Sequence, residues 1–175
     1  MSDNKRLNGI AINYRDFILS NSGNPEDYGW NREDVIEILT LIQSGEEGDW
    51  DFEDPDLLND IGAWFEDGVC TNADVYKAVY WYERAIALDS DLARSNLADI
   101  LRKGSHGYPK DLSRAFQLYS ECGLPYAHYR CGEFLEHGWG IEKDIDKART
   151  YYQLAYKEGH QLAKKKLAIW DFMNE

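Results

Sequence analysis

The second half of the chain repeats one spacing of apolar positions. Four apolar or small residues recur with offsets of 3, 4 and 3 in three separate segments. They are Val75, Ala78, Tyr82 and Ala85, then Leu112, Ala115, Tyr119 and Cys122, then Ile145, Ala148, Tyr152 and Ala155. These offsets place all four residues on one face of an α-helix. Each segment is therefore predicted to be an amphipathic helix.

A second periodic stretch precedes each of these helices, with offsets of 4, 4 and 3. Its positions are Leu57, Ile61, Phe65 and Gly68, then Ala93, Leu97, Leu101 and Gly104, then Ala127, Cys131, Leu135 and Gly138. A small residue follows the second position in each copy, namely Gly62, Ala98 and Gly132. Small residues let two helices approach closely, and the closing glycine suits the position after a helix.

Each unit is therefore predicted to be a helix, a loop and a second helix. We expect helix pairs near residues 55–88, 91–122 and 125–158, and a last helix near 161–172, where a fourth copy begins at Ala163, Leu167 and Ala168. We expect no β-sheet. One such unit cannot bury its apolar face alone, so neighbouring units must stack against each other.

The motifs of these units resemble the Sel-one-like repeat family, a relative of the tetratricopeptide repeat, over roughly residues 55–172. The third unit, with the loop GWGIEKD, and the second, with GSHGYPKD, match well. The first has the loop GVCTNAD, which lacks the second Gly and the Lys before Asp. The resemblance implies an all-α, right-handed α-solenoid of helix-turn-helix repeats. Members are protein-binding scaffolds and adaptors, and some are immunity proteins against bacterial toxins.

The first 54 residues do not show the repeat. Val35, Ile38, Leu39 and Ile42 lie on one face of a predicted helix, which Asn31 is placed to cap. Residues 5–20 are also predicted to be helical. We therefore divide the chain into an N-terminal helical cap and acidic linker, residues 1–54, and Sel-one-like repeats, residues 55–175.

Residues that suggest catalysis or metal binding have simpler explanations. Asp74, Asp111 and Asp144 each stand just before a predicted helix, where Asp caps free backbone N–H groups. The histidines do not have metal-binding spacing; they are His106, His128, His137 and His160. Cys122 and Cys131 fall on the apolar faces, and an odd count of three cysteines fits reduced thiols. We therefore expect that the protein is not an enzyme and that it binds no cofactor or metal.

Charge is concentrated in one region of the chain. The net charge is −13, and residues 26–74 hold sixteen acidic side chains against one basic side chain, Arg32. Such a region repels nucleic acid and anionic membranes and attracts cationic surfaces. The sequence also lacks an apolar run of membrane-helix length and a signal-peptide core, so we expect a cytoplasmic protein with no membrane contact.

The densest part of this region is EEGDWDFEDPDLLND, beginning at residue 46. Its spacing partly matches a calcium-binding EF-hand loop, through Asp49, Asp51, Glu53 and Asp60. However, position 6 of that loop is Asp54 instead of Gly, and Pro55 follows it. Asp54 and Pro55 fit better as the N-cap and first residue of a helix. A solvated face and a recognition surface remain the two interpretations.

We favour a recognition surface for a protein partner. Its predicted residues are Asp49, Trp50, Asp51, Phe52, Glu53, Asp56, Asp60, Glu66 and Asp67. The carboxylates would steer a basic partner, and Trp50 and Phe52 would be apolar anchors, unless Trp50 packs against the first repeat. The first hypothesis is a bacterial immunity protein that neutralises a basic toxin, such as a nuclease. The alternative is a regulatory adaptor that assembles the cell's own signalling or envelope proteins.

Overall fold

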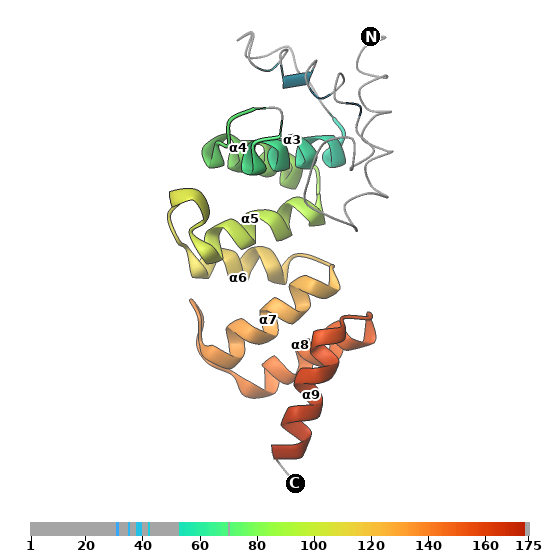
Figure 1. Ribbon diagram of the computed structural model, residues 1–175. Coiled ribbons are helices and arrows are strands. Elements are labelled where there is room, and N and C mark those ends of the chain that lie inside the picture. Colours follow the sequence, from blue (N-terminus) through green and yellow to red (C-terminus); the bar gives the residue numbers. More distant parts are fainter. Residues whose placement is uncertain are drawn as a thin grey trace. The chain divides into compact units, whose positions relative to one another are not determined.

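The computed structural model describes residues 53–69 and 71–173, together with five positions between 31 and 42. Its α-helices are α3 (Pro55–Asp67), α4 (Val75–Ala87), α5 (Asp91–Lys103), α6 (Leu112–Ser120), α7 (Pro125–His137), α8 (Ile145–Lys157) and α9 (Gln161–Met173), with a short 3₁₀ helix η2 (Ser105–Gly107) before α6 (Figure 1). The described ranges contain no strand. The predicted all-α fold and its helix pairs are confirmed; the right-handed sense stays a prediction.

The chain divides into two compact units, Met1–Ser90 and Asp91–Glu175. The first contains α3 and α4, and the second contains α5 to α9. The predicted helix at residues 5–20 lies outside the described residues, and the division at residue 54 stays a prediction. The backbone is helical at Val35, Ile38, Leu39 and Ile42, and the first three of these side chains are buried, as the spacing predicted.

Aspartates begin most of these helices. The side chain of Asp74 accepts hydrogen bonds from the backbone N–H groups of Tyr76 and Lys77, both at 3.1 Å. The same N-cap position before α3, α6 and α8 is taken by Asp54, Asp111 and Asp144. These bonds satisfy N–H groups that a helix leaves free at its first turn, so the predicted capping roles are confirmed.

The glycines after α3, α5 and α7 adopt the left-handed conformation that the spacing predicted. Gly68, Gly104 and Gly138 have φ angles of 71°, 70° and 72°. Side chains with a Cβ rarely adopt these angles, so Gly ends the first helix of each pair and lets the chain turn toward the second.

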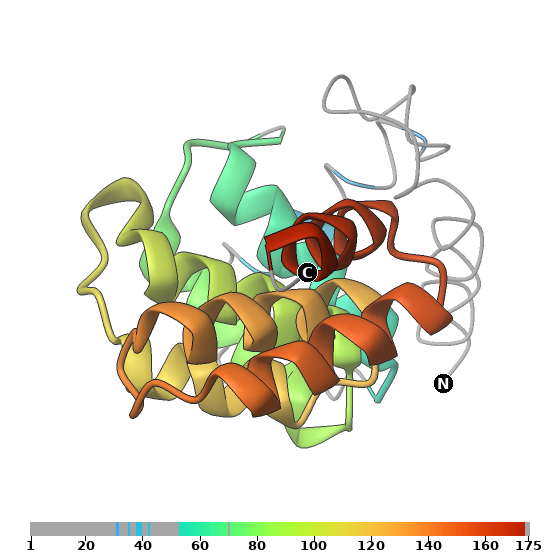
Figure 2. The same cartoon turned by 90° about the horizontal axis from the view of Figure 1, so that it is seen from below.

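The two helices of each pair pack closely, and in the second unit α9 packs against α8 (Figure 2). At Gly132 of α7, an added Cβ would lie 2.6 Å from the ring of Tyr152 in α8. At Gly62 of α3, it would lie 2.7 Å from the ring of Tyr82 in α4. The tyrosine ring therefore lies directly on the backbone of the first helix. We call this contact the tyrosine seat.

Each seated tyrosine also forms a hydrogen bond through its hydroxyl group. Tyr82 donates to Glu66 at 2.8 Å, and Tyr152 donates to Glu136 at 2.7 Å. In the middle pair Tyr119 donates to a different carboxylate, that of Asp99. All three rings are fully buried, so the prediction that they fill inter-helix contacts is confirmed; these are Tyr82, Tyr119 and Tyr152.

Truncation of a seated tyrosine should strongly destabilise the second unit. We expect Tyr152→Ala to lower the free energy of unfolding by about 3–5 kcal/mol, as for a buried aromatic side chain. Tyr152→Phe keeps the ring and should cost only about 0.5–1.5 kcal/mol, the usual worth of one hydrogen bond. Tyr156→Ala, at an exposed position of the same helix, should change stability by less than about 0.5 kcal/mol. Urea unfolding measures all three; equal losses at positions 152 and 156 would contradict the assignment.

Candidate protein-binding surfaces

The predicted partner-binding residues fall into two groups. Asp49, Trp50, Asp51 and Phe52 lie outside the described residues, so their part of the surface stays a prediction. The other five lie at the start of α3 or within it, and the structure gives each a distinct environment; they are Glu53, Asp56, Asp60, Glu66 and Asp67.

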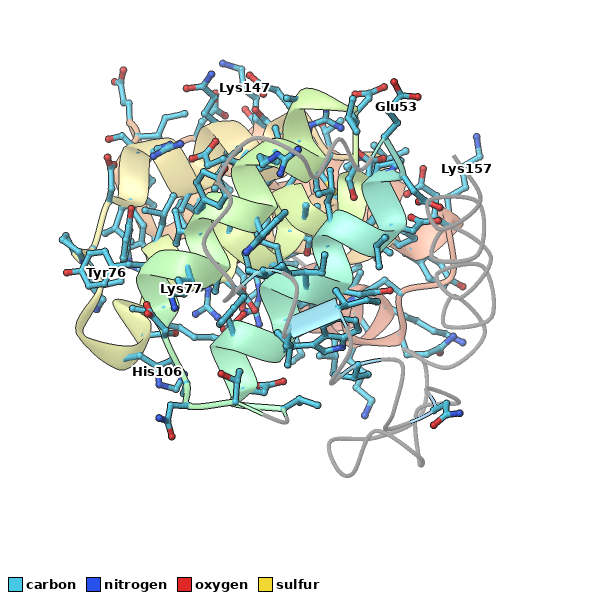
Figure 3. All side chains as sticks on the ribbon, turned by 90° about the horizontal axis from the view of Figure 1, so that it is seen from above. Glu53, Tyr76, Lys77, His106, Lys147 and Lys157 are labelled. Atoms are coloured by element: carbon cyan, nitrogen blue, oxygen red, sulfur yellow. The ribbon has the colours of Figure 1, made fainter. Side chains whose placement is uncertain are left out.

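Glu53 and Asp67 are exposed at opposite ends of α3. Figure 3 shows the Glu53 side chain projecting outward from the start of this helix. A rise of about 1.5 Å per residue separates the two positions by roughly 20 Å. They therefore lie too far apart to contact one side chain of a partner, although both contribute to the field of the first unit.

Asp56 and Glu66 are half-buried residues with local roles. Asp56 lies in the first turn of α3, where a negative charge favours the helix dipole, and its backbone N–H donates to the cap Asp54 at 2.9 Å. Glu66 accepts the hydroxyl hydrogen of Tyr82, so its carboxylate holds the tyrosine seat.

Asp60 was predicted to face a partner, but the structure buries it. Its side chain is only 1% exposed. Asn59 donates to Oδ1 at 3.3 Å, and Oδ2 has no hydrogen-bond partner among the described residues. Burial raises the pKa of Asp60 well above its ordinary value, the charges of Asp56 and Asp54 raise it further, and the Asn59 hydrogen bond opposes the rise. We therefore exclude Asp60 from the surface.

Two exposed tyrosines on α4 were missed by the sequence analysis. Tyr76 is 64% exposed and Tyr80 is 57% exposed, one helical turn apart. Tyr76 points away from the first unit (Figure 3), and the ring of Tyr80 meets Trp81 edge-on at 5.3 Å. Both tyrosines fall between the apolar positions of α4, so their spacing in the sequence indicated that they would be exposed. Exposed tyrosines beside an acidic helix are typical components of a protein interface.

A polar network joins α5 to α7 in the second unit. The carboxylate of Asp99 accepts hydrogen bonds from Tyr119 and from Tyr126, whose hydroxyl lies 3.0 Å from both oxygens. Burial opposes ionisation of Asp99, but the Tyr119 hydrogen bond and the cations Lys103 and Arg102 outweigh it and lower its pKa. Asp99 is therefore a charged acceptor that ties three helices together.

The network continues along α7 to the start of α9. The Arg130 guanidinium donates to the Tyr126 hydroxyl at 2.8 Å and to Glu133 at 2.5 Å. Tyr129 stacks on His160 with ring centroids 4.6 Å apart, and burial and Glu133 raise the pKa of Tyr129 to about 12. Because these groups are engaged with each other, we assign the network a structural role.

Among the described residues, two thiols and one histidine have environments that favour structural roles. Cys122 and Cys131 are buried and free, and burial raises their pKa values to about 11 and about 12. Nδ1 of His128 lies within hydrogen-bond distance of the Glu158 carboxylate, at 2.7 Å. Across residues 53–69 and 71–173, no three His, Cys, Asp or Glu side chains gather as a metal site. No helix in the described part of the chain is long and apolar enough to cross a membrane.

Comparison with known protein families finds the Sel1 repeat at residues 55–90, 92–121 and 125–160. These matches correspond to the three helix pairs and cover more than half of the chain. The chain belongs to the Sel1 repeat family. A curated relative, chitin synthase regulatory factor 3 of Schizosaccharomyces pombe, is 32% identical over 113 residues, covering 61% of this chain and 12% of that protein. The chain thus spans about an eighth of the length of this relative.

Two solved structures support the solenoid fold. A Sel1 repeat protein from Oxalobacter formigenes is 25% identical, with a TM-score of 0.62, and the match covers 77% of this chain and 99% of that one. The c5321 protein, a protective antigen of uropathogenic Escherichia coli with the same type of fold, is 17% identical, with a TM-score of 0.67, and the match covers 98% of this chain and 42% of that one. The second similarity concerns the fold alone.

The three Sel1 repeats differ sharply in charge. Residues 55–90 hold seven acidic and two basic side chains, a net charge of −5. The second repeat, residues 92–121, carries +2, and the third, residues 125–160, carries −1. A strongly negative net charge is therefore not a requirement of the Sel1 scaffold, because the second repeat is net positive and the third is close to neutral.

Replacing Asp60 with Asn should stabilise this Sel1 repeat protein in a pH-dependent way. Because the pKa of Asp60 is raised in the folded state, the contribution of Asp60 to stability falls as pH rises from about 4, the pKa of an unfolded Asp, through the folded value. Asp60→Asn removes this fall, so its advantage should be near zero at pH 4 and about 1 kcal/mol or more at pH 8. Urea unfolding at both pH values measures it; a variant less stable than the wild type at pH 8 would contradict the burial argument.

Proposed function

We propose that this Sel1 repeat protein recruits a basic protein partner through the acidic surface of its first unit. The observation that carries the proposal is the segregation of charge. The first unit, residues 1–90, holds twenty acidic and six basic side chains, whereas the second, residues 91–175, holds twelve and thirteen. The net charges are therefore −14 and +1. Charge that served only solubility would be mixed over both units.

The described residues of the first unit supply two kinds of interaction. Exposed carboxylates at Glu53 and Asp67 accelerate the approach of a basic partner through long-range attraction. The exposed rings of Tyr76 and Tyr80 can supply the contact energy that aromatic anchors usually dominate. The proposed surface retains the predicted residues of the acidic stretch, Asp49, Trp50, Asp51, Phe52 and Asp56.

Two specific forms of this function differ in the partner they require. The first is a bacterial immunity protein that binds and neutralises a basic toxin, and the strength of the localised charge supports it. The second is a regulatory adaptor for the cell's own proteins, and the name of the fission-yeast relative, a chitin synthase regulatory factor, supports it. Both forms are non-catalytic and act by occupying a surface of another protein.

Gene context and affinity distinguish the two forms. An immunity protein requires a toxin gene beside its own and a complex with nanomolar or lower Kd. An adaptor requires a reversible complex with an ordinary cellular protein. A toxin-free neighbourhood, combined with recovery only of weakly bound cellular proteins from the native host, would reject the immunity form and retain the adaptor.

Charge reversal should separate steering from anchoring. We expect Glu53→Lys combined with Asp67→Lys to lower the association rate of the recovered partner by about tenfold at low salt. The loss should shrink as the screening length falls from about 30 Å at 0.01 M salt to about 8 Å at 0.15 M. Trp50→Ala should instead raise the dissociation rate, because an anchor acts after docking.

The matched control reverses an exposed carboxylate of the second unit, Glu142→Lys. It should leave both rates within about twofold of the wild type, because it lies outside the acidic unit. Surface plasmon resonance at the two salt concentrations gives both rates. If the variant with Glu53→Lys and Asp67→Lys associates at the wild-type rate at low salt, the acidic residues are only a solvated face.

A further inference from the structure

Two tyrosines on α4 stand at positions where the other two repeats have polar side chains. Tyr76 and Tyr80 are 64% and 57% exposed. By the spacing of the repeat, the equivalent positions of α6 and α8 also hold exposed residues, namely Ser113, Gln117, Asp146 and Thr150. The Sel1 scaffold therefore does not need an aromatic ring at either position, and the two rings are a feature of the first repeat alone among the three.

The two rings belong to one side of α4, which we call the tyrosine face. It consists of Tyr76, Tyr80, Glu83 and Ala87, with offsets of 4, 3 and 4, and lies away from the buried positions of the helix. Figure 3 shows Tyr76 pointing outward from the first unit. Side chains four residues apart on a helix are neighbours at about 5–6 Å, so one planar group of a partner can contact both tyrosine rings.

The charge of the first unit indicates that this group is a cation. The unit has a net charge of −14. The backbone N–H of Asp74 donates to the carbonyl of Phe65 at 2.7 Å, so the end of α3, with the exposed Asp67, lies beside the start of α4. The Lys77 ammonium lies over the ring of Phe65, 5.2 Å from its centroid, and is thus directed toward α3. A cationic group of a partner is attracted to this side of the unit.

Contacts within the chain show how a cation lies on such rings. The guanidinium carbon of Arg130 lies 4.8 Å from the ring centroid of Tyr126 and 5.9 Å from that of Tyr129, so one arginine contacts two tyrosines of the same helix. On α4 itself, Arg84 lies over the ring of Trp81 at 5.0 Å. The planar guanidinium stacks on aromatic rings and is more weakly hydrated than an ammonium group, so exposed tyrosines favour arginine over lysine.

We propose that the tyrosine face binds an arginine side chain of the basic partner, with the guanidinium lying over the rings of Tyr76 and Tyr80. This inference rests on the proposed function, which supplies the basic partner, and it adds the type of residue that the partner presents. The carboxylates of the first unit attract any basic segment, whereas the two rings select a segment that contains arginine.

The test uses two short fluorescent peptides that alternate serine with arginine or serine with lysine. The peptides have the same length and charge, so long-range attraction treats them alike. Their dissociation constants with the full chain are measured by fluorescence anisotropy at about 0.15 M salt. The wild type should bind the arginine peptide about tenfold more tightly than the lysine peptide, because both rings contribute to the preference.

Substitutions taken from the middle repeat locate the binding site. Tyr76→Ser combined with Tyr80→Gln introduces the residues that α6 has at the equivalent exposed positions. This variant should bind the arginine peptide about tenfold more weakly and the lysine peptide within about twofold of the wild type. Tyr76→Phe combined with Tyr80→Phe keeps both rings and should keep the preference for arginine. Circular dichroism checks that each variant remains helical.

Two further variants separate the tyrosine face from the acidic surface. Tyr156→Ser is the matched control, because it removes an exposed tyrosine of α8 in the second unit; it should bind both peptides within about twofold of the wild type. Glu53→Lys combined with Asp67→Lys should weaken both peptides alike at low salt and leave the ratio of their dissociation constants unchanged.

Equal affinity of the wild type for the two peptides overturns the inference, and if both bind in a salt-dependent way the acidic surface is retained. A preference for arginine that survives Tyr76→Ser with Tyr80→Gln overturns it too, as does an equal loss in Tyr156→Ser. If neither peptide binds, the inference is wrong, and the charge-reversal test with the recovered partner judges the acidic surface separately. A dimer in sedimentation velocity that the same double variant dissociates, without binding of the arginine peptide, would assign the face to a second copy of the chain.

Discussion

The contact of one tyrosine ring with one glycine joins the two helices of the first and the third pair. Gly132 and Gly62 leave no room for a Cβ beneath the rings of Tyr152 and Tyr82. The ring therefore fixes the distance between the two helices, and its hydroxyl group fixes their register by bonding to a carboxylate. Buried apolar side chains such as Trp64, Leu97 and Phe134 complete the core, so the tyrosine contact acts together with them in positioning the surfaces that the chain exposes.

The middle pair also buries its tyrosine, Tyr119, but the hydroxyl of this tyrosine has a different acceptor. Glu66 and Glu136 each stand four residues after their small residue, but Arg102 takes that position in α5. Asp99 of the same helix accepts the tyrosine hydroxyl instead, and Arg102 donates to it at 3.0 Å. Asp99 also accepts from Tyr126 of the next pair. The changed acceptor thus links two consecutive repeats through one carboxylate.

The spacing of apolar and small residues predicted the fold well, because on a regular helix this spacing shows which side chains are buried. The recurring tyrosines, the capping aspartates and the closing glycines all occupy the roles that their spacing predicted. Asp60 was wrongly assigned to the partner-binding surface because it was grouped with the acidic residues next to it in the sequence. Its spacing of three from Leu57 and its position beside Ile61 put it on the apolar side of α3, where both neighbours are fully buried. The exposed Tyr76 and Tyr80 could not be assigned a function from spacing, since spacing does not tell an interface residue from an ordinary surface residue.

The two units combine one scaffold with two different surfaces. The first repeat concentrates acidic charge, and α9 in the second unit exposes the apolar side chains of Leu162 and Ile169 together with Lys165. Neither feature is needed to form a Sel1 helix pair, because the middle repeat is formed without either. Features that the scaffold does not require are the ones on which binding specificity is expected to depend.

A double-mutant cycle between Gly132 and Tyr152 tests the tyrosine seat most directly. With Tyr152 present, Gly132→Ala should clearly destabilise the second unit, because the new Cβ meets the ring at 2.6 Å. In the Tyr152→Ala background the same change should be neutral or stabilising by up to about 1 kcal/mol, the helix preference of Ala over Gly. An equal cost of Gly132→Ala in both backgrounds, measured by urea unfolding, would contradict the account.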